Sequence, residues 1–250
     1  MEIYGYSERG AMNALFYEMS FKDEQSAEKD LHEFLRTAGI EKPEQYESFE
    51  LYTESSLSEF GSPDLVIFAN HKVTNNKVVF FVEAKASCCK SYDLEGQKKR
   101  HETYIKQGKY DNGHASNLFF QMRLKEYFFK WIKAGEPKNR SSIKDDPHKR
   151  IEESNGRGRS YGDNVIVKKF VCLFKNVQEA HYIAIIPEKS IERIEPDSTY
   201  GFLIHFVTWK QLKEKFSEYK LLQKTLNFNQ VNISTRKGLK TKSQILNNIS

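Results

Sequence analysis

Three side chains that together suit metal-assisted phosphodiester chemistry lie at the ends of one segment, residues 61–85. Two apolar runs, LVIF after Asp64 and VVFFV before Glu83, flank an Asn-Asn turn and predict a β-hairpin. Side chains alternate along a strand, so Glu83 and Lys85 project to one side, and strand pairing can place Asp64 beside Glu83. Two carboxylates and one ammonium can bind a hard cation such as Mg²⁺ and stabilise a phosphate under attack by water.

The same residues form a pattern that is known from a family of enzymes. Pro63-Asp64 followed by Glu83-Ala84-Lys85 resembles the signature of the PD-(D/E)XK nuclease superfamily, over the hairpin and its flanks. The resemblance implies an α/β fold with a restriction-endonuclease-like αβββαβ core, in which helices flank a central mixed sheet. It further implies that Asp64 and Glu83 bind Mg²⁺, for which Mn²⁺ substitutes. The Ala84 carbonyl would be a further ligand, and Lys85 would position the attacking water.

The activity implied by the resemblance is metal-dependent cleavage of nucleic acid, with a DNA endonuclease of the restriction or defence type as the first expectation. Many members act on double-stranded DNA as homodimers. Two alternatives keep the fold: a protein that binds nucleic acid or a partner without catalysis, and a nuclease directed at RNA. A third is an unrelated α+β protein with a chance motif, which a wide separation of Asp64 from Glu83 would favour.

A further acid of the site is expected on the helix that precedes the hairpin. Residues 8–20 form this predicted helix, with Ser7 as its cap, and Glu8 lies one turn before the apolar residue Met12. The resemblance implies an additional acidic residue here, for which Glu8 is the first candidate and Glu18 the second. The alternative is structural, because a glutamate in a first helical turn is favoured by the helix dipole alone.

The remaining pattern supplies the scaffold. A second helix is predicted for residues 24–38, a strand for 48–53, and further strands for 165–174, 181–186 and 202–207. Thr208 and Gln211 form a capping-box pattern for a following helix. Residues 116–133, capped by Ser116, predict a helix with two apolar stripes, one for the sheet and one for the C-terminal elements or a second subunit. Gln121 on this helix is a candidate auxiliary residue by the resemblance.

Composition indicates a globular protein with a mildly basic surface. The chain has 250 residues, a net charge of +5 and three cysteines, which favours reduced thiols and a cytoplasmic location without membrane association. We expect one domain over residues 1–226, with polar insertions near 87–115 and 134–164, and a basic tail over 227–250. The candidate nucleic-acid-binding residues lie in the two insertions: Lys98, Lys99, Arg100, Arg157 and Arg159.

Overall fold

The computed structural model describes residues 8–57, 60–85, 93–107, 116–133, 165–187, 197 and 201–235, with only the backbone given for Glu8, Gln107, Val167 and residues 228–235. The strands are β1 (Tyr46–Thr53), β2 (Leu65–His71), β3 (Lys77–Ala84), β4 (Val177–Ile186) and β5 (Ile204–Thr208). The helices are α1 (Glu8–Ser20), α2 (Glu24–Thr37), the 3₁₀ turn η1 (Pro43–Gln45), α3 (Leu94–Gln107), α4 (Leu118–Lys133), α6 (Val165–Cys172), α7 (Trp209–Lys215) and α8 (Lys220–Thr235).

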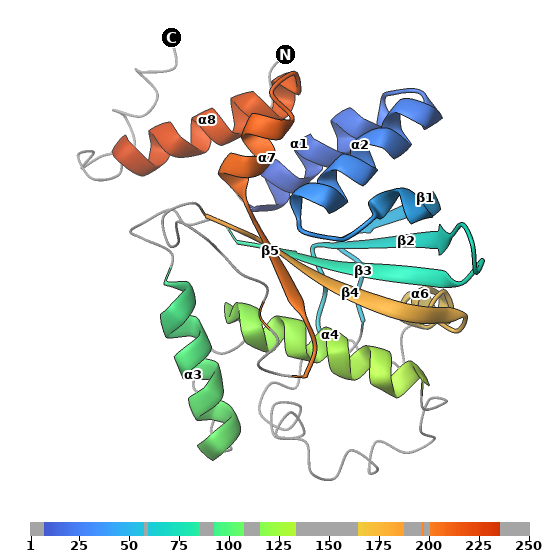
Figure 1. Ribbon diagram of the computed structural model, residues 1–250. Coiled ribbons are helices and arrows are strands. Elements are labelled where there is room, and N and C mark those ends of the chain that lie inside the picture. Colours follow the sequence, from blue (N-terminus) through green and yellow to red (C-terminus); the bar gives the residue numbers. More distant parts are fainter. Residues whose placement is uncertain are drawn as a thin grey trace.

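The five strands form one mixed sheet in the order β1-β2-β3-β4-β5. Strands β1, β2 and β3 pair antiparallel, whereas β3, β4 and β5 run parallel, so β3 is the central strand at which the direction pattern changes. Helices lie on both sides of this sheet (Figure 1). The predicted α/β class with a mixed sheet flanked by helices is therefore confirmed.

Each face of the sheet has its own hydrophobic core because side chains alternate along the strands. One core joins Val78, Phe80 and Val82 of β3 to the layer of α1, α2, α7 and α8. The other joins Val79 and Phe81 to α4, α6 and the turn after α6. Figure 1 shows these two layers above and below the sheet, with α3 beside α4. Odd-numbered residues at the end of β3 therefore face α4.

Local signals in the sequence correctly predict several of these elements. The β2–β3 turn contains Asn75 at a φ of 53°, which asparagine tolerates better than most residues. Gly39, at a φ of 84°, follows the end of α2. At the start of α7, the Gln211 amide donates to the Thr208 hydroxyl at 3.1 Å and the Thr208 amide donates to the Gln211 side chain at 2.8 Å. The predicted capping box is present.

The segment 165–174 was wrongly predicted as a strand. It contains helix α6, followed by a turn. Phe170, Val171 and Phe174 are buried at helical spacing, and the Phe174 ring lies 4.8 Å from the rings of Phe68 and Phe128. The β-branched run favours a strand locally, but the helix is more stable because it buries Phe170 and Phe174 against the sheet.

Three further differences concern polar segments. Helix α3 forms inside the predicted insertion 87–115, where the periodicity is weak. The cap of α4 is Asn117 and not Ser116, because Asn117 Oδ1 accepts from the Phe120 amide at 3.1 Å, while Gln97 Oε1 of α3 accepts from the Leu118 amide at 2.9 Å. Helix α8 runs past residue 227, where we expected the tail to begin. The insertion 134–164 and residues 236–250 lie outside the described residues.

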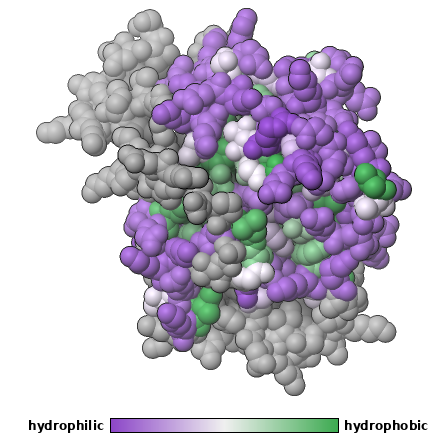
Figure 2. All heavy atoms as spheres, in the orientation of Figure 1, coloured by the Kyte–Doolittle hydropathy of each residue, from purple (hydrophilic) through white to green (hydrophobic). Residues whose placement is uncertain are grey.

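The second apolar stripe of α4 is partly covered within the chain, with Phe120 and Leu124 buried and Tyr127 and Trp131 half-buried. Phe120 lies 6.4 Å from the ring of His101 on α3, and Trp131 lies 5.6 Å from Phe60, so this stripe gives no support for a homodimer. The face of the protein seen in Figure 2 is mostly hydrophilic, with hydrophobic side chains in several small areas. None of the described helices has both the length and the apolar character needed to cross a membrane.

Candidate active site

The two acids of the motif meet where β2 begins and β3 ends. Leu65 pairs with Val82 in the antiparallel register, so Asp64 comes opposite Glu83. The Ala84 amide donates a 2.8 Å hydrogen bond to Asp64 Oδ2, which holds this carboxylate across the end of β3. Strand pairing in the structure therefore places Asp64 beside Glu83, as the sequence predicts.

Strand alternation places Glu83 and Lys85 on the side of α4. The positions two and four residues before Glu83, Phe81 and Val79, belong to the core on that side. The Lys85 backbone is fixed at both ends: its amide donates to Ile185 O at 2.8 Å, and its carbonyl accepts from Trp209 Nε1 at 3.0 Å. Strand β4 and the start of α7 therefore hold the lysine at the sheet end.

Glu83 is buried and forms an ion pair with Lys125 of α4. Each side chain is only 1% exposed, and Lys125 Nζ contacts Glu83 Oε1. Gly61, at a φ of 84°, lies close to this ammonium, since a Cβ at that position would be 3.5 Å from Lys125 Nζ. The loop before Asp64 thus approaches the helix closely, and the ion pair joins α4 to the central strand.

The electrostatics of Glu83 reflect this setting. Burial raises the pKa of the Glu83 carboxyl, and the negative charge of Asp64 adds to the increase. The positive charges of Lys125 and Lys85 oppose it but do not cancel it. Asp64 and Lys85 are themselves only half-buried. A ligand would therefore reach Glu83 from the side of these two residues.

Gln121 lies one helical turn before Lys125, on the same side of α4. Its Oε1 atom is buried and has no hydrogen-bond partner among the described residues. A buried amide oxygen without a donor is unfavourable, so this oxygen is available to a ligand that brings a donor or a cation. The placement agrees with the auxiliary position that the resemblance assigns to Gln121, and its role stays a prediction.

The two candidates on α1 lie in different surroundings. Arg9 Nη1 pairs with Glu54 Oε2 at 3.5 Å, and the Glu54 amide donates to Asp64 O at 3.3 Å, so α1 begins near the Asp64 end of the sheet. The side chain of Glu8 itself lies outside the described side chains. The Glu18 carboxylate accepts the amides of Leu221 and Leu222 at 3.0 and 2.9 Å, and it thereby caps α8. Glu18 thus has a structural partner.

The predicted nucleic-acid-binding residues are only partly placed. Lys98 on α3 forms a 2.9 Å ion pair with Asp197, whereas Lys99 and Arg100 are exposed on the same helix. Arg157 and Arg159 lie outside the described residues. Lys98 is therefore paired within the chain. Lys99 and Arg100 are exposed, and nucleic-acid binding by them stays a prediction.

Lys125 is the site residue that sequence reasoning missed. A signal was present, because a lysine one turn after Gln121 shares its side of a mostly apolar helix. A charged residue within an apolar pattern is buried only when it is paired, so such a lysine calls for a buried acid as its partner. The motif glutamate is that partner.

The donor set suits a hard divalent cation. Mg²⁺ is commonly bound by one or two protein carboxylates, with water and substrate phosphate completing its shell, and Asp64 and Glu83 supply two adjacent carboxylates. The described residues contain no group of three or more His, Cys, Asp or Glu side chains arranged to hold a metal ion. Asp64 and Glu83 would therefore form a site that relies on oxygens from outside the protein side chains.

No family model, curated protein or solved structure matches the chain.

Proposed function

We propose that the protein is a divalent-metal-dependent nuclease with a restriction-endonuclease-like core, and that Asp64, Glu83 and Lys85 form its active site. The observation that carries the proposal is the convergence of these three residues at the end of β3. Glu83 is buried there beside Asp64, and Lys85 is held at the same sheet end by backbone hydrogen bonds.

The order of elements supports the same proposal. One helical layer precedes three antiparallel strands, helices α3, α4 and α6 follow, and the next strand, β4, pairs parallel with β3. This order is consistent with the αβββαβ core that the motif resemblance implies, with additional helices between β3 and β4 and with β5 beyond β4. The acids lie where β2 begins and β3 ends, which is the position that the hairpin motif assigns to them.

Each residue has a chemical role in the proposal. Asp64 and Glu83 would hold Mg²⁺, and when bound, the ion would lower the pKa of a water molecule and polarise the scissile phosphate. Lys85 would orient that water and stabilise charge on the phosphate as the bond breaks. The half-buried state of Asp64 and Lys85 leaves these two groups within reach of a nucleic-acid backbone.

A cleavage assay tests the proposal. Plasmid DNA and single- and double-stranded DNA and RNA oligonucleotides are incubated with Mg²⁺, Mn²⁺ or EDTA. We expect metal-dependent cleavage of at least one substrate, and a loss on the order of 10²–10³-fold in Asp64→Ala and Lys85→Ala. Lys72→Ala is the matched control, because Lys72 pairs with Glu28 of α2 at 3.4 Å, outside the proposed site.

The assay also separates the competing functions. Equal cleavage by the wild type and by folded Asp64→Ala would refute the assignment of the site. Binding of nucleic acid without cleavage under any metal condition would favour a non-catalytic binding protein. Cleavage of RNA alone would keep the site and change the substrate class.

A further inference from the structure

The buried ion pair between Glu83 and Lys125 places a protein cation on one of the two carboxylates proposed to bind metal. Both side chains are 1% exposed, and they come from the central strand and from the helix that covers it. Most other buried positions of α4 are apolar, including Phe119, Met122 and Phe128, and the buried Glu126 is paired with Lys130 at the surface. A lysine at this one position therefore needs an explanation beyond the packing of α4.

Stability does not supply that explanation. Two buried charges lose their hydration, and replacing such a pair by well-packed apolar residues is often neutral or stabilising. Removing only one partner is costly, because it leaves an uncompensated charge in the interior. Lys125 is thus required as long as Glu83 is present without another cation, and Glu83 is required by the proposed chemistry.

The charges around this pair indicate what happens when another cation arrives. Asp64, Glu83, Lys85 and Lys125 carry formal charges that cancel. A divalent cation added to this set leaves an excess of two positive charges, which an anionic phosphate backbone can offset. Without that anion, the divalent cation would have to bind the Glu83 carboxylate, which Lys125 already neutralises.

Resting on the proposed function, we propose that Lys125 is the internal counter-ion of Glu83 and competes with the divalent cation for this carboxylate. In the metal-free protein Lys125 keeps the buried Glu83 charge compensated and in place. The same contact weakens metal binding in the absence of nucleic acid. Lys125 is accordingly a positioning residue, and it sets the metal affinity of the site.

Thermal unfolding with Mn²⁺ as the probe tests this without any substrate. Lys125→Met in EDTA is expected to lower the Tm by about 10 °C, because Glu83 loses its only buried partner cation among the described residues. Adding Mn²⁺ should restore about half of that loss or more, by mass action on the vacated carboxylate, while the wild-type Tm shifts by less than about 2 °C. A merely structural lysine would give a deficit that Mn²⁺ does not reduce.

Two further variants complete the design. The double variant Glu83→Gln with Lys125→Met should be more stable in EDTA than Lys125→Met alone and should not respond to Mn²⁺. Lys72→Met is the matched control, since both side chains of the Lys72–Glu28 pair are partly exposed, at 38% and 32%. If Lys125→Met does not fold, Lys125→Gln takes its place, because its amide can still donate to Glu83.

Equal Mn²⁺ shifts in the wild type and in the Lys125 variant, or no shift in either, would overturn the proposal. So would an unchanged Tm of Lys125→Met in EDTA. No nucleic acid enters this experiment, so its result is independent of the cleavage assay. Cleavage together with equal Mn²⁺ shifts would refute the role of Lys125 and leave the nuclease proposal standing. Unequal Mn²⁺ shifts without cleavage would support the competition between Lys125 and metal and refute the nuclease proposal.

Discussion

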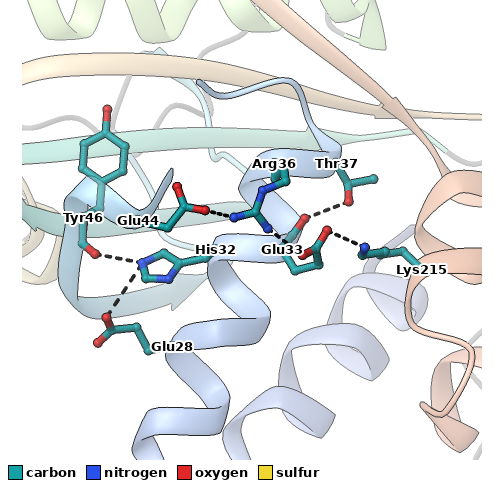
Figure 3. A network of polar contacts seen from close by, with 8 residues as sticks. All are labelled: Glu28, His32, Glu33, Arg36, Thr37, Glu44, Tyr46 and Lys215. Atoms are coloured by element: carbon teal, nitrogen blue, oxygen red, sulfur yellow. Dashed lines mark hydrogen bonds and ion pairs between the residues drawn. The ribbon is translucent and has the colours of Figure 1, made fainter. Parts of the chain in front are cut away.

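The two faces of the sheet hold the same kind of ion pair in opposite environments. On the helical layer of α1, α2, α7 and α8, Glu33 pairs with Lys215 at 2.6 Å and with Arg36, and these side chains are 26–45% exposed (Figure 3). On the α4 face, Glu83 pairs with Lys125 at 1% exposure. Solvent access, not the residue types, separates the two pairs.

The two glutamates respond in opposite directions. Partial burial raises the pKa of Glu33, but the hydrogen bond from Lys215 and the charge of Arg36 outweigh it, so that the pKa of Glu33 is lowered. Burial raises the pKa of Glu83 more than Lys125 lowers it. An exposed pair adds little stability, and a buried pair costs its own desolvation. A charge retained at that cost is better explained by chemistry than by stability.

The largest effect should come from breaking one ion pair on each face. A double-mutant cycle with Glu83→Gln and Lys125→Met should give a coupling free energy of about 3 kcal/mol, since either single change leaves an unpaired buried group. The matched cycle with Glu33→Gln and Lys215→Met should give less than about 1 kcal/mol. Urea unfolding of the wild type, the single variants and the double variants measures both values. Similar couplings on the two faces would contradict the comparison.

The pH dependence of stability tests a second buried titrating group on the α4 side, and the pKa values of His181 and His205 are lowered by burial in the same way. Burial, together with the charge of Arg123, lowers the pKa of His101 on α3 to about 4. The folded protein keeps this imidazole neutral while the unfolded chain takes up a proton near pH 6.5, so the stability present above pH 6.5 is lost as the pH falls towards 4. This residue should contribute a loss of about 2 kcal/mol in unfolding free energy between pH 7 and 5.

Urea unfolding at pH 7 and pH 5 measures that loss. The variant His101→Phe should show a shallower fall, because the titrating group is removed and an aromatic ring remains beside Phe119 and Phe120. Thr103→Val, an exposed change on the same helix that removes no titrating group, should keep the wild-type slope. Identical slopes in wild type and His101→Phe would count against the buried neutral histidine.

The smallest expected effect is the difference between Glu8 and Glu18, the two candidate acids on α1. Glu18→Ala should lower the free energy of unfolding by about 1 kcal/mol, because the α8 amides of Leu221 and Leu222 lose their acceptor, and it should leave cleavage unchanged. Glu8→Gln should do the reverse and reduce cleavage at unchanged stability. Urea unfolding and the cleavage assay on both variants provide the measurement. A loss of cleavage in Glu18→Ala would show that the acids are assigned the wrong way round.

Prediction from sequence succeeded where the determining interactions are local. Helix α2, the β2–β3 hairpin and the Thr208 capping box follow from periodicity, turn residues and cap residues that lie within a few positions of one another. It failed at 165–174, where a β-branched run forms a helix because Phe174 packs between Phe68 and Phe128 from other elements. It also placed the α4 cap at Ser116, although the adjacent Asn117 accepts from the Phe120 amide three positions on. Only the bond from the Leu118 amide to Gln97 of α3 is non-local here.

The sequence by itself determined that Asp64, Glu83 and Lys85 would share one end of a hairpin, since strand alternation and the Asn75 turn are properties of adjacent residues. Only the tertiary structure decided that Lys125 would pair with Glu83 and that Glu18 would cap α8. Those contacts join residues far apart in the chain, and they exist because α4 packs on the central strand and α8 packs on α1. The burial of Glu83, and with it the direction of its pKa shift, depends on the same packing.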